Sequence, residues 1–113
     1  MTPDLATRIL KHLKDNHLGP SRAIPRDKLM GHFGMDPKDV TADREFRLWY
    51  SEMGIPTCNE GLYWPRGKED RDAFEKYAWP HMNPRAFRER MAAFDRMFEH
   101  CRADQGEQLR LGI

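Results

Sequence analysis

The fold is decided by the stretch of residues 24–65, which contains IPRDKLMGHFG (24–34), FRLWYSEMGIP (46–56) and CNEGLYW (58–64). A Leu and a Phe four residues apart predict a short helix over residues 26–33, ended by a glycine. A second helix is expected over residues 41–53, with Thr41 as its N-cap and Gly54 at its end. The two helices are separated by a polar turn.

Two short strands should follow, Ile55–Cys58 and Gly61–Trp64, joined across Asn59-Glu60 as a hairpin. A very short edge strand at Ala23-Ile24 precedes the first of the two helices. The order of helix, turn, helix and hairpin is the layout of a winged helix-turn-helix, in which the second helix and the wing face a DNA groove.

Outside this stretch, the apolar spacing predicts a helix over residues 3–16 with Thr2 as N-cap, another over residues 68–78, and a long final helix capped by Asn83. The fold class is therefore mostly α with a small β-hairpin. We expect a winged helix-turn-helix at residues 1–66 and a C-terminal helical extension at residues 67–102, packed on it or dimerising. Residues 103–113 should form a flexible tail.

The totals restrict the function. With 113 residues the chain is one domain, and no apolar run approaches the roughly 20 residues that span a bilayer. The start of the chain has no basic-then-apolar signal region, so a cytoplasmic location is expected. Cys58 and Cys101 stand in no metal-ligand spacing, and His12 and His17 lie five residues apart. We expect no metal, no cofactor and no enzymatic site.

Charge is unevenly distributed along the chain, although the net charge is only +1. Residues 1–35 carry six Lys or Arg and three acids, a net +3, whereas residues 36–53 carry three and five, a net −2. A helical projection of residues 41–53 still places the positive side chains together on the outward face. The opposite face carries aromatic residues and should be core.

This outward face supplies the predicted DNA contacts, because Arg suits guanine edges and phosphates and Ser suits phosphate oxygens. Flanking cations near the first helix of the pair and past the wing would add backbone contacts. The predicted DNA-binding residues are Thr41, Arg44, Arg47, Ser51, Arg26, Lys28, Arg66 and Lys68. The alternative is a solvated helix face with internal charge pairs, such as Asp43 with Arg47.

The chain resembles small winged helix-turn-helix proteins of bacteriophages and prophages. The matching residues are Ala23, Ile24, Arg26, Leu29, Phe33, Gly34, Arg44, Arg47, Glu52, Gly54, Ile55, Pro56, Gly61, Tyr63 and Trp64. The resemblance covers roughly residues 5–100 and implies the fold more specifically than any function. The chain departs from the family in a longer turn before the second helix of the pair, and in Pro25 at the usual capping Ser or Thr.

Apolar residues of the final helix recur at heptad spacing: Phe87, Met91, Phe94 and Phe98, followed by Cys101. This seam is either core of the same chain or the contact of a homodimer, which would suit an operator with two half-sites. In the tail, Gln108-Leu109-Arg110-Leu111 is similar to the short peptide by which bacterial replication proteins bind the sliding clamp. It lacks the usual final Phe, and we read it as a chance match.

Two functions follow from these patterns. The first is a DNA-binding protein of a phage or mobile element, a small transcription regulator with the second helix of the pair in the major groove of double-stranded DNA. The alternative is a protein-interaction module, an inhibitor or assembly factor that binds a host or phage protein. The outward Arg residues favour the first, and the low net charge and the acidic wing tip at Glu60 favour the second.

Overall fold

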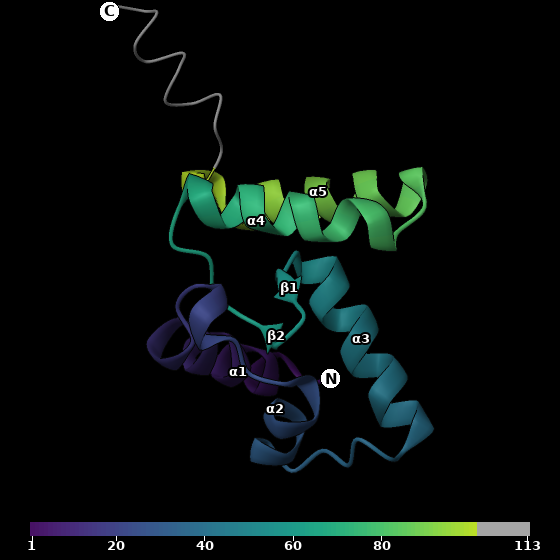
Figure 1. Cartoon of the computed structure of the whole chain (residues 1–113). Coiled ribbons are helices and arrows are strands. Elements are labelled where there is room, and N and C mark those ends of the chain that lie inside the picture. The colour runs from purple at the N-terminus through teal and green to yellow at the C-terminus, as the bar shows by residue number, and fades with distance from the viewer. Residues whose placement is uncertain (102–113) are drawn as a thin grey trace, which may run out of the picture.

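The computed structural model describes residues 1–101 of the chain, and in this range the protein is mostly helical with a small two-stranded antiparallel sheet (Figure 1). The helices are α1 (Pro3–Asn16), α2 (Arg26–His32), α3 (Val40–Met53), α4 (Lys68–Ala78) and α5 (Pro84–Met97). The strands are β1 (Thr57–Cys58) and β2 (Gly61–Leu62). Single-turn 3₁₀ helices come after α1 at Pro20–Arg22, after α4 at Trp79–His81 and after α5 at Glu99–Cys101. The predicted tail at 103–113 lies outside the described residues.

Side-chain caps fix the starts of α1 and α5 as predicted. The Thr2 hydroxyl accepts a hydrogen bond from the Leu5 amide at 3.2 Å, and the Asn83 side chain accepts one from the Ala86 amide at 2.8 Å. Each cap is followed by a proline at the first helical position, where its missing N–H has no intrahelical partner to lose. The predicted helices at 3–16 and 68–78 are both confirmed to the residue.

The predicted start of α3 is wrong. Its N-cap is Asp39 rather than Thr41, because the Asp39 carboxylate accepts hydrogen bonds from the Thr41 amide at 2.9 Å and the Ala42 amide at 3.3 Å. Thr41 thus lies in the first turn of the helix. The end of α3 is confirmed: Gly54 is left-handed, with φ of 77°.

The hairpin has the predicted two-residue turn, but its strands are shorter than expected. Thr57 pairs with Leu62, and Cys58 pairs with Gly61. Ile55 and Trp64, which were expected in the strands, bond elsewhere. The Ile55 amide donates to a carbonyl in the last turn of α3, and the Trp64 amide donates at 2.7 Å to the carbonyl of His17, the residue after α1. The outer edge of β2 is instead bridged by Ile24, which exchanges hydrogen bonds of 2.8 and 2.9 Å with Leu62.

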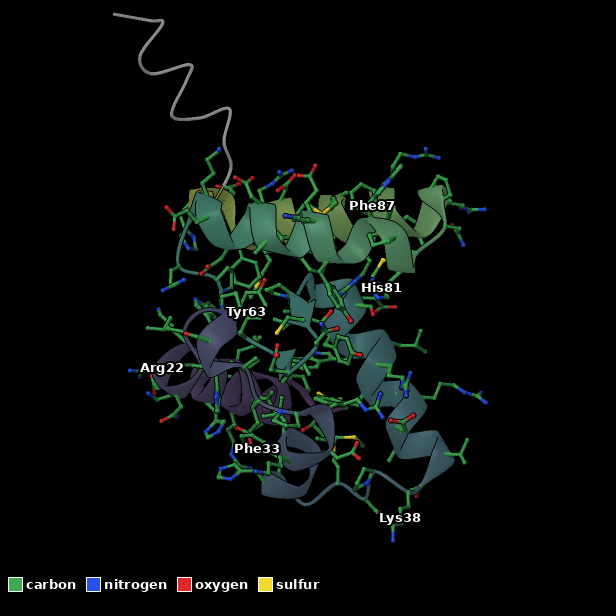
Figure 2. All side chains as sticks on the ribbon, in the orientation of Figure 1. Arg22, Phe33, Lys38, Tyr63, His81 and Phe87 are labelled. Carbon is green, nitrogen blue, oxygen red and sulfur yellow. The ribbon has the colours of Figure 1, made fainter. Side chains whose placement is uncertain are left out.

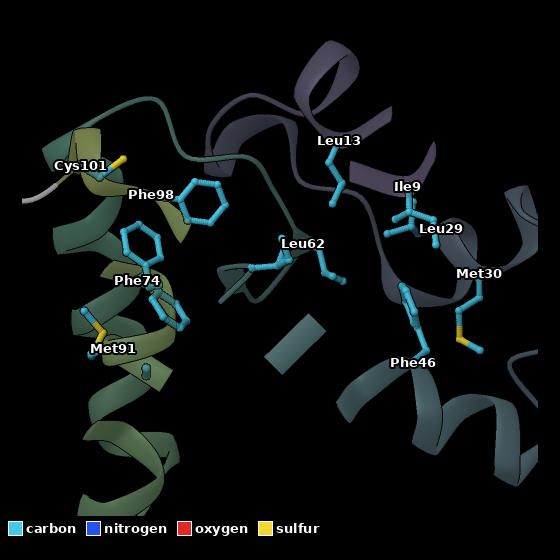
Figure 3. Packing of buried hydrophobic residues seen from close by; sticks show 13 residues of the cluster. Ile9, Leu13, Leu29, Met30, Phe46, Leu62, Phe74, Met91, Phe98 and Cys101 are labelled. Carbon is cyan, nitrogen blue, oxygen red and sulfur yellow. The ribbon is translucent and has the colours of Figure 1, made fainter. Parts of the chain in front are cut away.

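One hydrophobic core joins the two halves of the described chain. In Figure 1, α4 and α5 form one layer above α1, α2 and α3, with the hairpin between. Figure 3 shows Leu62 between the two sets of apolar side chains, with Ile9, Leu13 and Leu29 on one side and Phe74 on the other. The C-terminal extension therefore packs on the first 66 residues.

The heptad seam of α5 contributes to this core. Met91, Phe94 and Phe98 are at most 7% exposed, and Phe94 stacks on Phe74 of α4. Phe87, labelled on α5 in Figure 2, is half-buried against Trp79. Of the two alternatives for the seam, packing within one chain accounts for the three buried residues. No helix within residues 1–101 is long and apolar enough to cross a membrane.

Candidate nucleic-acid interface

The N-terminal half of α3 presents the predicted polar stripe to solvent. Thr41, Arg44 and Arg47 are all exposed, and α3 lies at the outer edge of the molecule (Figure 1). Phe46 on the opposite face is fully buried, stacked on Trp49 at 5.8 Å between ring centroids. The aromatic side of the helix thus anchors it, and the charged side is free for a partner.

Ser51, the last member of the stripe, has different surroundings. It is half-buried and lines a groove between α3 and α5. A helical projection gives the direction of Ser51 around α3 but not the presence of α5, which comes more than thirty residues later. The surface available to a large partner is therefore the N-terminal half of α3.

An ion-pair chain links α2 to this surface. Asp43 lies between two guanidinium groups, 3.2 Å from Arg26 Nε and 3.0 Å from Arg47 Nε. Arg47 Nε donates a hydrogen bond to Asp43. Arg26 Nε and Asp43 Oδ1 are close enough for an ion pair, but neither atom has a hydrogen-bond partner among the described residues. Within residues 1–101 no ion pair involves Arg44 or Lys28, and both are exposed. Asp27 also lies 3.4 Å from Arg26 Nη2, so the cluster holds two acids against several cations.

The cations past the hairpin are paired locally. The Arg66 guanidinium donates to Asp70 from Nε and Nη2, both at 2.9 Å, and the Arg66 backbone amide donates to the same carboxylate at 2.7 Å. Lys68 pairs with Asp72 at 3.2 Å. In Figure 1 the start of α4 lies across the molecule from the N-terminal end of α3, so these two cations do not converge with Arg44 and Arg47.

The Asp70 carboxylate has a structural role. It is buried at the third position of α4 and reaches back to the amide of Arg66, just before the N-cap Gly67, which has no capping side chain. The Tyr63 hydroxyl donates to the Asp70 carbonyl at 3.2 Å. Burial raises the pKa of Asp70, but the hydrogen bonds from Arg66 outweigh it, and the net pKa lies below the ordinary 3.8.

We expect Asp70→Asn to lower the free energy of unfolding by about 2 kcal/mol at pH 7, since hydrogen bonds to a buried carboxylate are lost. Because the folded pKa is lowered, this contribution is complete above pH 3.8 and is lost as the pH falls through the folded pKa. Urea unfolding of both proteins should therefore show a difference at pH 7 that narrows below pH 3.8. A difference independent of pH would contradict the carboxylate's role.

Three histidines that look scattered in the sequence meet in the structure. His12 stacks on His32 with centroids 4.4 Å apart, and its Nε2 lies 3.3 Å from Nε2 of His17, whose Nδ1 is 2.8 Å from the Arg22 carbonyl. Burial and the two neighbouring imidazoles lower the pKa of His12. Sequence spacing missed the cluster because the chain reverses after α1 and α2 returns beside it. Among residues 1–101, no group of three or more His, Cys, Asp or Glu is arranged to hold a metal ion.

The structure thus brings together Arg26, Arg44 and Arg47 of the predicted site, places Thr41 beside them, and separates Ser51, Arg66 and Lys68 from them. What the arrangement offers chemically is an exposed helix face with two arginines, beside a hollow of about 450 Å³ that Arg26 and Arg47 line together with Asp27 and Glu60. Comparison of the chain with protein-family models, with curated proteins and with solved structures finds no match.

Proposed function

We propose that the protein binds double-stranded DNA with the N-terminal half of α3 in the major groove, as a small winged-helix regulator of a phage or mobile element. The observation that carries this proposal is the common exposure of Thr41, Arg44 and Arg47 on a helix anchored by its opposite face. Arg44 and Arg47 have the reach and donor geometry for base edges or phosphates.

The surrounding elements support a winged helix-turn-helix. Helix α2, the turn of residues 33–39, α3 and the hairpin follow in the expected order, and Ile24 forms a single β-bridge beside β2. The hairpin tip, Asn59-Glu60, is exposed and carries no cation. Arg26 and Lys28 of α2, rather than the wing, are therefore the flanking residues that would contact phosphate.

The sharpest variant is Asp43→Asn, which removes the acid between Arg26 and Arg47. We expect duplex DNA to bind roughly three- to tenfold more tightly, because Arg47 is released toward the phosphates, Arg26 keeps only its contact with Asp27, and a negative charge is removed. Asp72→Asn is the matched control: it makes the same change in net charge but releases Lys68 on α4. Fluorescence anisotropy of a labelled duplex measures all three proteins.

The control also locates the interface. Equal gains for Asp43→Asn and Asp72→Asn would show a general charge effect, and a gain for Asp72→Asn alone would move the contact to α4. Arg44→Ala combined with Arg47→Ala should weaken binding at least tenfold with an unchanged circular dichroism spectrum. Unchanged affinity in that double variant contradicts the proposed surface.

One observation favours the alternative, a protein-interaction module. Val40 and Leu48 are 73% and 55% exposed on the same side of α3 as Arg44, from which each is one helical turn away. Exposed apolar side chains beside an Arg are typical of the centre of a protein–protein interface. In this alternative α3 would dock on a host or phage protein instead of DNA.

A further inference from the structure

A groove with a volume of about 670 Å³ lies between the C-terminal half of α3 and α5. Its size falls in the range of small-molecule sites. Leu48 and Ser51 line it from α3, and Ala86, Arg90 and Ala93 line it from α5, with Met82 at one end. Figure 1 shows α5 passing above the end of α3.

Small residues create the hollow while keeping the helices in contact. Ala86 and Ala93 flank Arg90 on the groove face of α5, four residues before it and three after it, so short side chains stand where longer ones would fill the space. At Gly54 the helices touch directly, since a Cβ there would lie 2.4 Å from the carbonyl carbon and oxygen of Ala93. The packing therefore holds the walls of the groove in place.

Arg90 is a buried cation without a carboxylate. Arg90 is only 8% exposed, and no Asp or Glu within residues 1–101 forms an ion pair with it. It donates to three carbonyls at the end of α3: Ile55 at 3.1 Å, and Tyr50 and Ser51 at 3.4 Å. A guanidinium has five N–H donors, and two of these three bonds are long.

Two aromatic rings also lie beside Arg90. The guanidinium carbon lies 5.8 Å from the ring centroid of Tyr50 and 5.1 Å from that of Phe74. Burial lowers the pKa of Arg90, which means that the site disfavours its charge. Buried charges in proteins are normally paired with an opposite charge, and a groove beside this one has room for it.

A second cation lines the same groove. Arg96 is exposed and, within the described residues, belongs to no ion pair. The groove also contains Glu52 and Glu89, and Glu89 is paired with Arg85 at 3.2 Å. The two glutamates would repel a dianion. Because Glu89 is already paired, Glu52 offsets one of the two positive charges of Arg90 and Arg96, and a ligand with a single negative charge balances the other.

We propose that this groove binds a small organic acid with one carboxylate, which pairs with the exposed Arg96 on the side of the groove that Arg90 also lines, and with an apolar body, which lies along Leu48, Met82 and the two alanines. Such a ligand brings a negative charge near Arg90, which has carbonyl partners but no carboxylate partner in the described part of the chain, and covers the exposed Leu48 side chain. This site is separate from the proposed DNA contact at the N-terminal half of α3 and does not depend on it.

A matched pair of probes tests the proposal: 3-phenylpropionate and its uncharged analogue 3-phenylpropan-1-ol, titrated into the full chain and followed by ¹H–¹⁵N NMR. We expect the acid to shift the amides of residues 48–57 and 82–96 and to bind roughly tenfold more tightly than the alcohol, the size of one charge-assisted hydrogen bond. Ala86→Phe, which fills the groove, should abolish the binding.

Arg96→Gln should weaken binding of the acid severalfold. Arg88 is an exposed arginine on the same helix that does not line the groove, so Arg88→Gln should leave the affinity for the acid unchanged. Neither variant removes a buried side chain, so both retain the fold. The proposal is overturned if acid and alcohol bind equally, if the shifted amides lie elsewhere, if Ala86→Phe binds the acid as well as the wild type, or if neither probe shifts any amide.

Discussion

Gly61→Ala is expected to lower the free energy of unfolding by about 4 kcal/mol or more, a large part of the roughly 5–15 kcal/mol that keeps a native domain folded. Gly61 has a φ of 136°, which an alanine tolerates poorly. A Cβ at this position would lie 2.0 Å from the Ile24 carbonyl oxygen and 2.7 Å from the Pro25 nitrogen. Both neighbours are backbone atoms, so relief requires breaking the bridge between Ile24 and Leu62.

Gly31→Ala provides the matched control. Gly31 lies within α2, and a Cβ there would meet no atom within 4 Å. Because alanine favours the helix, this variant should be stabilised by about 0.5–1 kcal/mol. Urea denaturation of the two variants should thus give changes of opposite sign. A Gly61→Ala protein as stable as the wild type would contradict the close approach of Ile24 to the hairpin.

Arg90→Ala is expected to cost about 3 kcal/mol of unfolding free energy. The substitution removes the hydrogen bond that Arg90 donates to the Ile55 carbonyl and so weakens the end of α3. It also leaves a void beside the rings of Tyr50 and Phe74. The desolvation of a charge is also relieved, which limits the loss, because a buried cation is itself unfavourable.

Two further variants separate these effects. Arg90→Met keeps most of the apolar stem without the charge and should be less destabilised than Arg90→Ala. Arg88→Ala, two residues earlier on the exposed side of the same helix, should change stability by less than about 0.5 kcal/mol. If thermal unfolding of Arg90→Ala matched that of Arg88→Ala, Arg90 would have no part in joining α5 to α3.

The features predicted correctly from the sequence are those with local causes. Thr2 and Asn83 cap helices through amides three residues away, and Gly54 ends α3 by its own backbone conformation. The predicted start of α3 is wrong although its cause is also local: Asp is a better N-cap than Thr, and Asp39 precedes Thr41 by only two residues. The mainly helical class with one small hairpin follows from such signals.

The features that sequence reasoning missed depend on pairs far apart in the chain. Arg90 donates a hydrogen bond to the carbonyl of Ile55, 35 positions earlier in the chain. Asp43 of α3 forms an ion pair with Arg26 of α2. Helical projection identified the outward face of α3 but gave neither Asp43 as the acid shared by two arginines nor α5 as the cover over Ser51. Only the packing of α5 on α3 decides which half of the predicted stripe a partner can reach.

The central claim, that the exposed half of α3 binds DNA, is tested most directly by titrating the wild-type protein with a random-sequence duplex at two salt concentrations, about 50 and 200 mM. We expect binding at the lower salt concentration and an affinity roughly a hundredfold weaker at the higher one, as for about four phosphate contacts. An absence of binding at the lower salt, or an affinity that does not change with salt, would contradict it and would favour a protein partner for α3.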